Sequence, residues 1–293
     1  MRNKMPWALV IILVMPLLFV QSTTTDTTVT IGTKDKPVLV YRYGDVAYKP
    51  YVEKLYTPNG LNVVRDAPKD HIHHHGLMFA VKVDDVNFWE EQDEPGREHH
   101  QTITTTANGI VEAIDWKAPK KEKALLHEQR TLTLPDVGNG DATLLSWETQ
   151  FSLPEGKKSA TLTGSHYHGL GLRFVESMDK DCTFRNKEGN KGKRFRGTEE
   201  LTEATWSAIF AKVDGKPVTV AMFHHPDNVR PTTWFTMSGH FAYMSATMRY
   251  HEDPLKIDEG SPLTLRYGVA VWDGHATDQD INGLYQQWIT SAP

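Results

Sequence analysis

Short runs rich in Val, Ile, Thr, Tyr and Phe, each ended by Gly, Asn, Asp or Pro, recur along this chain. β-Branched and aromatic residues favour extended strands, and the residues between the runs favour turns. The clearest case is Asp214-Gly215, between the runs at residues 206–212 and 218–223, because an Asp-Gly pair supplies the positive φ angles of a tight hairpin. Many short strands joined by turns restrict the chain to an antiparallel β fold.

One segment near the C-terminus departs from this pattern. Residues 278–290 carry Ile281, Leu284, Tyr285 and Trp288 at helical spacing, which predicts a helix that docks on the sheets through one apolar face. No long internal repeat or linker interrupts the rest of the chain. We therefore expect an all-β fold, an antiparallel β-sandwich of jelly-roll or mutarotase-like type, with a short C-terminal helix.

The first residues have the layout of a secretory signal peptide. Two cations precede an apolar run at residues 7–20, which is short for a membrane span. We expect a signal peptide at 1–22, a polar lead-in at 23–36 and one sandwich domain at 37–293, exported to the periplasm or outside the cell. An uncleaved anchor is the alternative, and no later stretch is apolar enough to cross a bilayer.

Cysteine content and charge narrow the choice of stabilising forces and partners. Cys182 is the one cysteine, so the fold has no intramolecular disulfide and depends on its core. The formal net charge of −5 gives no electrostatic reason to expect nucleic acid as a partner.

Histidine is the residue type that points to a site. All fourteen histidines lie at or after position 71, and most fall in four groups, at residues 71–75, 99–100, 166–168 and 224–225. Imidazole suits both proton transfer near neutral pH and metal binding. The candidate catalytic residues are His71, His73, His74, His225 and Glu91. The candidate substrate-binding residues are Trp89, His99, His100, His168, Arg173 and Trp234. A bound divalent metal is left open, because it would use the same histidines.

Simpler interpretations stand beside these assignments. Adjacent histidines such as His99 and His100 cannot both point inward from a regular strand, so about half of the grouped histidines are expected on the surface or in the scaffold. The isolated histidines are expected to be structural, and Glu90 and Glu91 are alternatively a solvated pair. The basic segment at residues 185–196 is expected to be a solvated loop, with a clamp for an anionic sugar or phosphate as the alternative.

The longest histidine motif carries a family resemblance. Residues 70–77 read Asp-His-Ile-His-His-His-Gly-Leu, and Phe88-Trp89, residues 169–173 and residues 223–230 continue the pattern. With these motifs the chain resembles an uncharacterised exported bacterial family, a family of unknown function automatically labelled methane oxygenase PmoA, in which the first motif has Pro for Ile72 and Arg for His75. The resemblance favours His71, His73, His74 and His225 over His75 and His224, and it adds Asn228 and Arg230 as substrate-binding candidates.

The sequence does not have the features that the label methane oxygenase would require. A membrane methane monooxygenase needs several membrane spans, whereas the mature chain is expected to have none. A secreted copper oxygenase with an amino-terminal histidine brace needs a histidine at the cleavage point, whereas the first histidine here is His71. A metal-dependent oxidase is therefore a minor alternative.

The leading hypothesis is an exported carbohydrate-active enzyme, a hydrolase, lyase or epimerase, in which histidines of the first and fourth groups act as acid and base or as metal ligands. Its partner would be a carbohydrate or another small polar substrate. The main alternative is a noncatalytic carbohydrate-binding sandwich, in which aromatics and histidines only hold the ligand. A structural envelope protein with incidental histidines is the third hypothesis.

Overall fold

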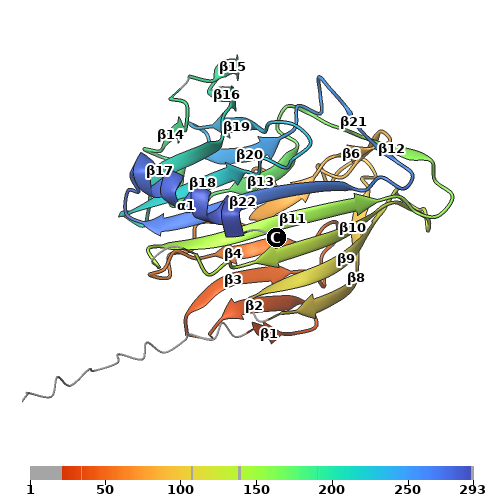
Figure 1. Cartoon of the computed structure of the whole chain (residues 1–293), viewed down its shortest axis with the longest axis horizontal. Coiled ribbons are helices and arrows are strands. Elements are labelled where there is room, and N and C mark those ends of the chain that lie inside the picture. The colour runs from red at the N-terminus through yellow and green to blue at the C-terminus, as the bar shows by residue number, and fades with distance from the viewer. Residues whose placement is uncertain (1–21, 34, 107, 138–139, 190, 292–293) are drawn as a thin grey trace, which may run out of the picture.

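The computed structural model describes residues 22–291 except 34, 107, 138–139 and 190. Within them, two large antiparallel sheets and one small sheet are followed by an α-helix, α1 (Asp278–Ser291) (Figure 1). The expected antiparallel β-sandwich with a C-terminal helix is confirmed. Residues 1–21 of the expected signal peptide lie outside the described residues. Among the described helices, none has the length and apolar character needed to cross a membrane.

The sheets draw their strands from distant parts of the chain. The spatial order of the ten-stranded sheet is β1 (Ser22–Thr24), β2 (Thr28–Gly32), β3 (Pro37–Arg42), β4 (Tyr51–Leu55), β5 (Leu77–Ala80), β13 (Gly169–Arg173), β20 (Tyr243–Thr247), β19 (Thr233–Met237), β16 (Glu199–Glu203) and β15 (Lys193–Arg196). The eight-stranded sheet consists of β14 (Thr183–Asn186), β17 (Trp206–Val213), β18 (Lys216–His224), β22 (Leu263–Asp273), β11 (Ala142–Ser152), β10 (Ala124–Thr133), β9 (Gly109–Lys117) and β8 (Arg97–Thr105). The four-stranded sheet consists of β21 (Leu255–Asp258), β12 (Ser159–Thr163), β6 (Lys82–Val83) and β7 (Val86–Asn87).

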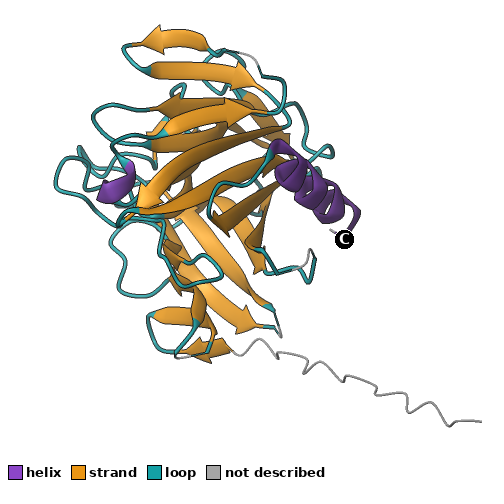
Figure 2. Ribbon diagram, turned by 90° about the vertical axis from the view of Figure 1, so that its left-hand side faces the viewer, coloured by secondary structure: helices purple, strands orange, loops and turns teal. Residues whose placement is uncertain are grey.

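Local sequence signals explain the best-predicted elements. The β17–β18 hairpin turns at Asp214 and Gly215, whose φ angles are 50° and 82°. Helix α1 begins with a reciprocal cap, in which Asp280 N–H donates to the Thr277 hydroxyl and Thr277 N–H donates to the Asp280 carboxylate. Its apolar face packs on β17, β18 and β22, where Trp288 contacts Phe223. Figure 2 shows α1 on one side of the strands and the short 3-10 helix η1 (Glu176–Met178) on the other.

Two segments differ from the sequence expectation. The expected polar lead-in at residues 23–36 contains β1 and β2, and Val29 and Ile31 are buried in the core. Threonines alternate with these two residues along β2, so a strand that is buried on one face has the composition of a polar leader. The basic segment at 185–196 is not simply a loop, because its two ends belong to β14 and β15.

A buried ionic network joins the two large sheets. The Arg130 guanidinium on β10 donates to Glu128 Oε1 at 2.7 Å and to Glu98 Oε2 at 3.0 Å, and all three side chains are fully buried. It also donates to the Tyr41 hydroxyl on β3 of the facing sheet at 3.1 Å and lies over the Trp147 ring. Buried charged groups lose their contacts with water, so the protein itself must supply their hydrogen-bond and ion-pair partners.

Arg130→Met should destabilise the protein strongly, because it leaves Glu98 and Glu128 as buried carboxylates without their cation. We expect a loss of about 3–5 kcal/mol in the free energy of unfolding, measured by urea denaturation. Lys158→Met is the matched control, since it breaks an exposed ion pair with Glu259 and should cost less than about 1 kcal/mol. Similar losses in the two variants would contradict a special role for the buried network.

Candidate functional site

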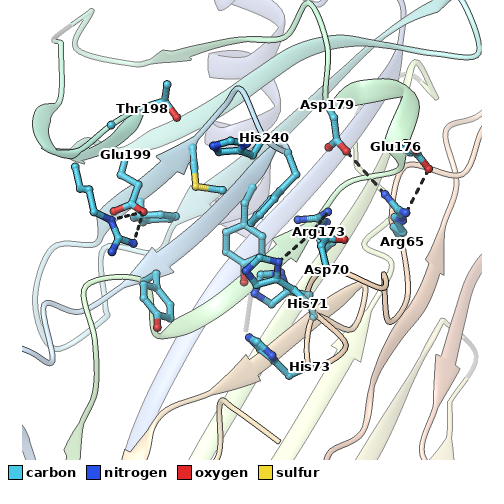
Figure 3. A pocket seen from close by; sticks show the side chains of 18 of the residues that line it. Arg65, Asp70, His71, His73, Arg173, Glu176, Asp179, Thr198, Glu199 and His240 are labelled. Carbon is cyan, nitrogen blue, oxygen red and sulfur yellow. Dashed lines mark hydrogen bonds and ion pairs between the residues drawn. The ribbon is translucent and has the colours of Figure 1, made fainter.

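A cleft of about 890 Å³ lies on the face of the ten-stranded sheet, close to η1 (Figure 3). Its floor includes a row of directly paired residues on neighbouring strands, Arg173 on β13, Tyr243 on β20 and Met237 on β19. Side chains alternate along a strand, so neighbours such as Leu172 and Met244 point instead to the core between the sheets. The same strands therefore supply both the core and the cleft floor.

Gly171 leaves space for the side chains of Tyr243 and Trp89 at the cleft floor. A Cβ atom built on this glycine would lie 1.9 Å from the Tyr243 hydroxyl and 2.9 Å from the Trp89 ring. Trp89 can therefore lie against the sheet, where it is fully buried and stacks on His168 with ring centroids 4.9 Å apart and planes 9° apart. These two candidate residues lie beneath the cleft as a support.

A compact turn before β5 presents the first histidine group to the cleft. His71 N–H donates to Pro68 O and His74 N–H donates to His71 O, each at 3.0 Å. The turn ends at Gly76, with φ of 41°, where a Cβ atom would lie 2.1 Å from the backbone oxygen of Val52. No side chain fits there, and this close approach fixes the turn against β4.

The turn places three imidazoles in contact. The ring centroids of His71 and His74 are 4.7 Å apart, those of His73 and His74 are 4.6 Å apart, and those of His71 and His73 are 5.7 Å apart. All three line the cleft, His74 being the buried one. The turn leads directly into β5.

His71 belongs to a carboxylate–imidazole pair. Its Nδ1 lies 2.9 Å from Asp70 Oδ2, and Arg173 Nη2 donates to the same oxygen at 2.9 Å. Arg173 is buried and stands over the Phe241 ring at 3.6 Å, so its position is fixed. Among the described residues, no hydrogen bond occupies Nε2 of His71. With Nδ1–H held by Asp70, Nε2 is the free proton acceptor.

The neighbouring titratable groups have defined charges near neutral pH. Burial, together with the nearby Lys49 ammonium, lowers the pKa of His73 to about 4, so its imidazole is neutral. Burial opposes the ionisation of Glu90, but the neighbouring His168 ring and the Asn87 amide hold its pKa at about 2, so it is a carboxylate. It accepts a hydrogen bond from the Tyr167 hydroxyl at 3.1 Å. The cleft thus combines neutral imidazoles with an ionised carboxylate.

The fourth histidine of this group, His75, holds the turn in place through both of its ring nitrogens. Its Nδ1 lies 2.7 Å from Asp66 Oδ1 and its Nε2 lies 2.9 Å from Glu91 Oε1. Lys49 Nζ donates to the same Glu91 oxygen at 2.7 Å, and Tyr51 stacks on the His75 ring. Hydrogen bonds occupy both ring nitrogens of His75 and the Glu91 oxygen. This series of contacts, from Lys49 through Glu91 to His75, positions the turn.

The structure does not bring the first and fourth histidine groups together. His225 contacts the Trp288 ring of α1, and Asn228 exchanges two hydrogen bonds with the Arg266 backbone. Arg230 pairs with Asp253, and the indole of the fully buried Trp234 donates to Ala204 O. None of these residues lines the cleft.

The second histidine group also lies elsewhere. His99 is exposed on β8, whereas His100 turns toward the sandwich interior and binds Glu112 at 2.7 Å. The expectation that these adjacent residues face opposite ways is confirmed. Among the candidates from the sequence, the cleft is therefore lined by His71, His73, His74 and Arg173.

Sequence reasoning missed several lining residues. These include Asp70, Tyr167, Asp179, Glu199, His240, Phe241 and Tyr243. Asp70 and Tyr167 adjoin the histidine motifs, so their position was a usable signal. Asp179 and Glu199 come from separate segments and face each other across the cleft (Figure 3).

Binding of a metal ion would require several of these side chains to converge. Within the described ranges, no group of three or more His, Cys, Asp or Glu side chains has an arrangement that could hold a metal ion. Nδ1 of His71 and both nitrogens of His75 already face carboxylates.

His75→Gln should reduce stability in a pH-dependent way. Burial lowers the pKa of His75, but its bonds to Asp66 and Glu91 raise it above the ordinary value of 6.5 overall. The resulting stabilisation is complete below pH 6.5 and is lost as the pH rises through the folded-state pKa. The same bonds lower the pKa values of Asp66 and Glu91, so their contributions are lost as the pH falls below their ordinary values of 3.8 and 4.5.

The difference in unfolding free energy between the wild type and His75→Gln should therefore be largest between about pH 4.5 and 6.5 and shrink above that range. Urea denaturation across pH 4–9 measures it, with His127→Gln as the control, since His127 has an exposed carboxylate pair with Asp115. A difference that grows above pH 7 would refute this assignment.

Solved structures resemble the chain in fold. An α-galactosidase from Lactobacillus brevis has 7% identity and a TM-score of 0.51, over 92% of this chain and 42% of the galactosidase. A GH36 α-galactosidase variant from Geobacillus stearothermophilus, in complex with 1-deoxygalactonojirimycin, has 10% identity and a TM-score of 0.50 over the same shares. The chain thus spans about two fifths of these enzymes, and at such identities the likeness concerns the fold alone.

No curated protein matches the chain significantly. A family model does, over residues 28–286, which include β2, the histidine turn, the whole cleft and most of α1. The chain therefore belongs to a family of unknown function, DUF6807.

Proposed function

We propose that this chain is an exported carbohydrate-active enzyme, a hydrolase, lyase or epimerase, whose cleft moves protons through His71. The observation that carries the proposal is the Asp70–His71 pair at the cleft, anchored by Arg173. A carboxylate on Nδ1 fixes the tautomer, leaves Nε2 as the base and stabilises the imidazolium that forms when the base accepts a proton. The same ring can then return that proton to a leaving group.

The lining of the cleft supports a saccharide as substrate. Carboxylates such as Asp179 and Glu199 can accept hydrogen bonds from hydroxyl groups, and Phe235 and Phe241 add flat apolar surface. Two α-galactosidases contain sandwiches of this fold, and the structure of one of these enzymes is a complex with 1-deoxygalactonojirimycin. Ligand pockets commonly measure about 300–1,000 Å³, so the cleft has room for a sugar.

His71→Gln should remove turnover while leaving the fold intact. General acid–base catalysis contributes about 10²–10⁴-fold, so kcat should fall by that amount. The assay uses mature protein without a histidine tag, on gluco-, galacto-, manno- and xylo-configured glycosides and oxidised glycosides, with chelator or with added divalent metals. Asp70→Asn should lower kcat as well, because an amide no longer stabilises the imidazolium.

His127→Gln is the matched control, because His127 is exposed on β10 and its Nδ1 lies 2.6 Å from Oδ1 of Asp115 on the neighbouring β9. It removes a similar imidazole–carboxylate pair outside the cleft and should leave kcat unchanged. Full activity in His71→Gln would contradict the role of His71. Turnover abolished by chelator and restored by metal would assign the histidines to metal binding instead.

The second candidate is a noncatalytic carbohydrate-binding sandwich. It is favoured by the extent of the structural likeness, since the chain corresponds to about two fifths of the galactosidases and not to a whole enzyme. In that case saccharides bind to the wild type without turnover, and His71→Gln changes affinity alone.

We further propose that the protein acts in the periplasm or outside the cell after cleavage of its leader. N-terminal sequencing of protein secreted from a Gram-negative host should begin at Thr23, because the leader is expected to end at Ser22. An intact N-terminus in the membrane fraction would indicate the uncleaved anchor instead.

A further inference from the structure

An exposed aromatic side chain stands at the rim of the cleft. Phe195 on β15 is 51% exposed, and the next residue, Arg196, lines the cleft. Burial of such a ring in the core would stabilise the fold by about 1.5–3 kcal/mol, so its exposure gives up stability. Large hydrophobic side chains with this exposure are few among the described residues, the others being Ile72 and Val229.

Phe195 is held in place on a rigid support. Its ring stacks on His166 with centroids 3.8 Å apart and planes 23° apart. His166 Nε2 lies 3.1 Å from Glu199 Oε2, and Arg196 Nη2 donates to Glu199 Oε1 at 2.7 Å. One face of the ring rests on His166, so the exposed half of the side chain presents the opposite face.

The ring continues an aromatic row that runs through the cleft. His166 contacts Phe235 with centroids 5.4 Å apart, and Phe235 contacts Tyr243 at 6.2 Å. Tyr243 in turn lies 4.8 Å from His74, next to His71. Phe235, Tyr243 and His74 line the cleft, so the row connects Phe195 with the proposed base.

The charged pair that lines the cleft beside the ring favours a neutral ligand. Arg196, from the basic segment, is already neutralised by Glu199, which accepts from both Arg196 Nε and Nη2. A paired arginine and carboxylate offer donors and acceptors to hydroxyl groups without a net positive charge for an anion. An aromatic face beside such a pair suits the apolar face and the hydroxyl edge of a sugar ring.

We propose that Phe195 is a second sugar subsite, so that the cleft takes a neutral saccharide of at least two units. One unit lies at His71, and another unit of the same saccharide stacks on Phe195. This inference rests on the proposed carbohydrate function and adds the length and charge of the ligand. The cleft volume of about 890 Å³ is consistent with more than one ring, since it lies near the top of the usual range of about 300–1,000 Å³.

The test measures affinity against chain length. Calorimetric titrations use neutral gluco-, galacto-, manno- and xylo-saccharides of one to six units, together with glucuronic acid and its oligomers. The protein is the full mature chain carrying His71→Gln, so that ligands are not turned over. Neutral oligomers should bind about tenfold more tightly than their monosaccharide, which corresponds to one stacking contact.

Phe195→Ala should abolish this dependence on length and leave the affinity for the monosaccharide unchanged. Phe195→Trp should retain it, because a flat ring is kept, and this variant controls for loss of the edge strand. Val229→Ala removes a comparably exposed apolar residue that neither lines the cleft nor adjoins a residue that does, and it should have no effect.

Four results would overturn the inference. Affinity that does not change with chain length, or equal losses for monosaccharide and oligomers in Phe195→Ala, would reject the subsite while the carbohydrate function stands. Preference for the uronate oligomers would reject the neutral ligand. Binding of no saccharide to any of the proteins would reject the proposed function itself, and the subsite with it.

Discussion

The buried guanidinium of Arg130 is the interaction on which the arrangement of the two sheets depends. It holds Glu128 on its own strand, β10, and Glu98 on β8, two strands away in the same sheet, and it reaches Tyr41 on the other sheet. Apolar side chains tolerate small shifts between sheets, but buried charges do not, because each must keep its partner. The network therefore fixes the relative position of the sheets. Tyr41 also donates to Glu112, and Glu112 binds His100, so this histidine serves the core and not the cleft.

This constraint reaches the cleft through neighbouring residues. Arg130 also donates to Pro50 O, and the adjacent Lys49 binds Trp89 O and Glu91. Glu91 holds His75 and so the turn that presents His71 and His73. The cleft is thus built on a continuous set of hydrogen bonds that starts between the sheets. Such support keeps a catalytic side chain in one geometry, which proton transfer requires.

The sequence was sufficient for the fold class and for one wall of the cleft. Strand composition, the Asp214-Gly215 turn and the spacing in α1 are local signals, and local signals survive without knowledge of the tertiary structure. The turn holding His71 was found because its histidines are adjacent in the chain. The fourth histidine group does not lie at the cleft. The sequence could not show this, because it carries no information on the distance in space between two groups that are far apart in the chain. Asp179 and Glu199 had no signal, since a single acidic residue in a polar segment is usually solvated.

The choice of His71 as the proposed base follows from comparison with the other hydrogen-bonded histidine–carboxylate pairs in the described part of the chain. His75 has both nitrogens bound to carboxylates, and His166 has one on Ser165 and the other on Glu199. His100 and His127 have a free nitrogen but lie outside the cleft. A base needs a fixed tautomer, a free nitrogen and access to a ligand together. Of these pairs, Asp70–His71 alone meets all three conditions, and it does so at the end of the aromatic row that leads to Phe195.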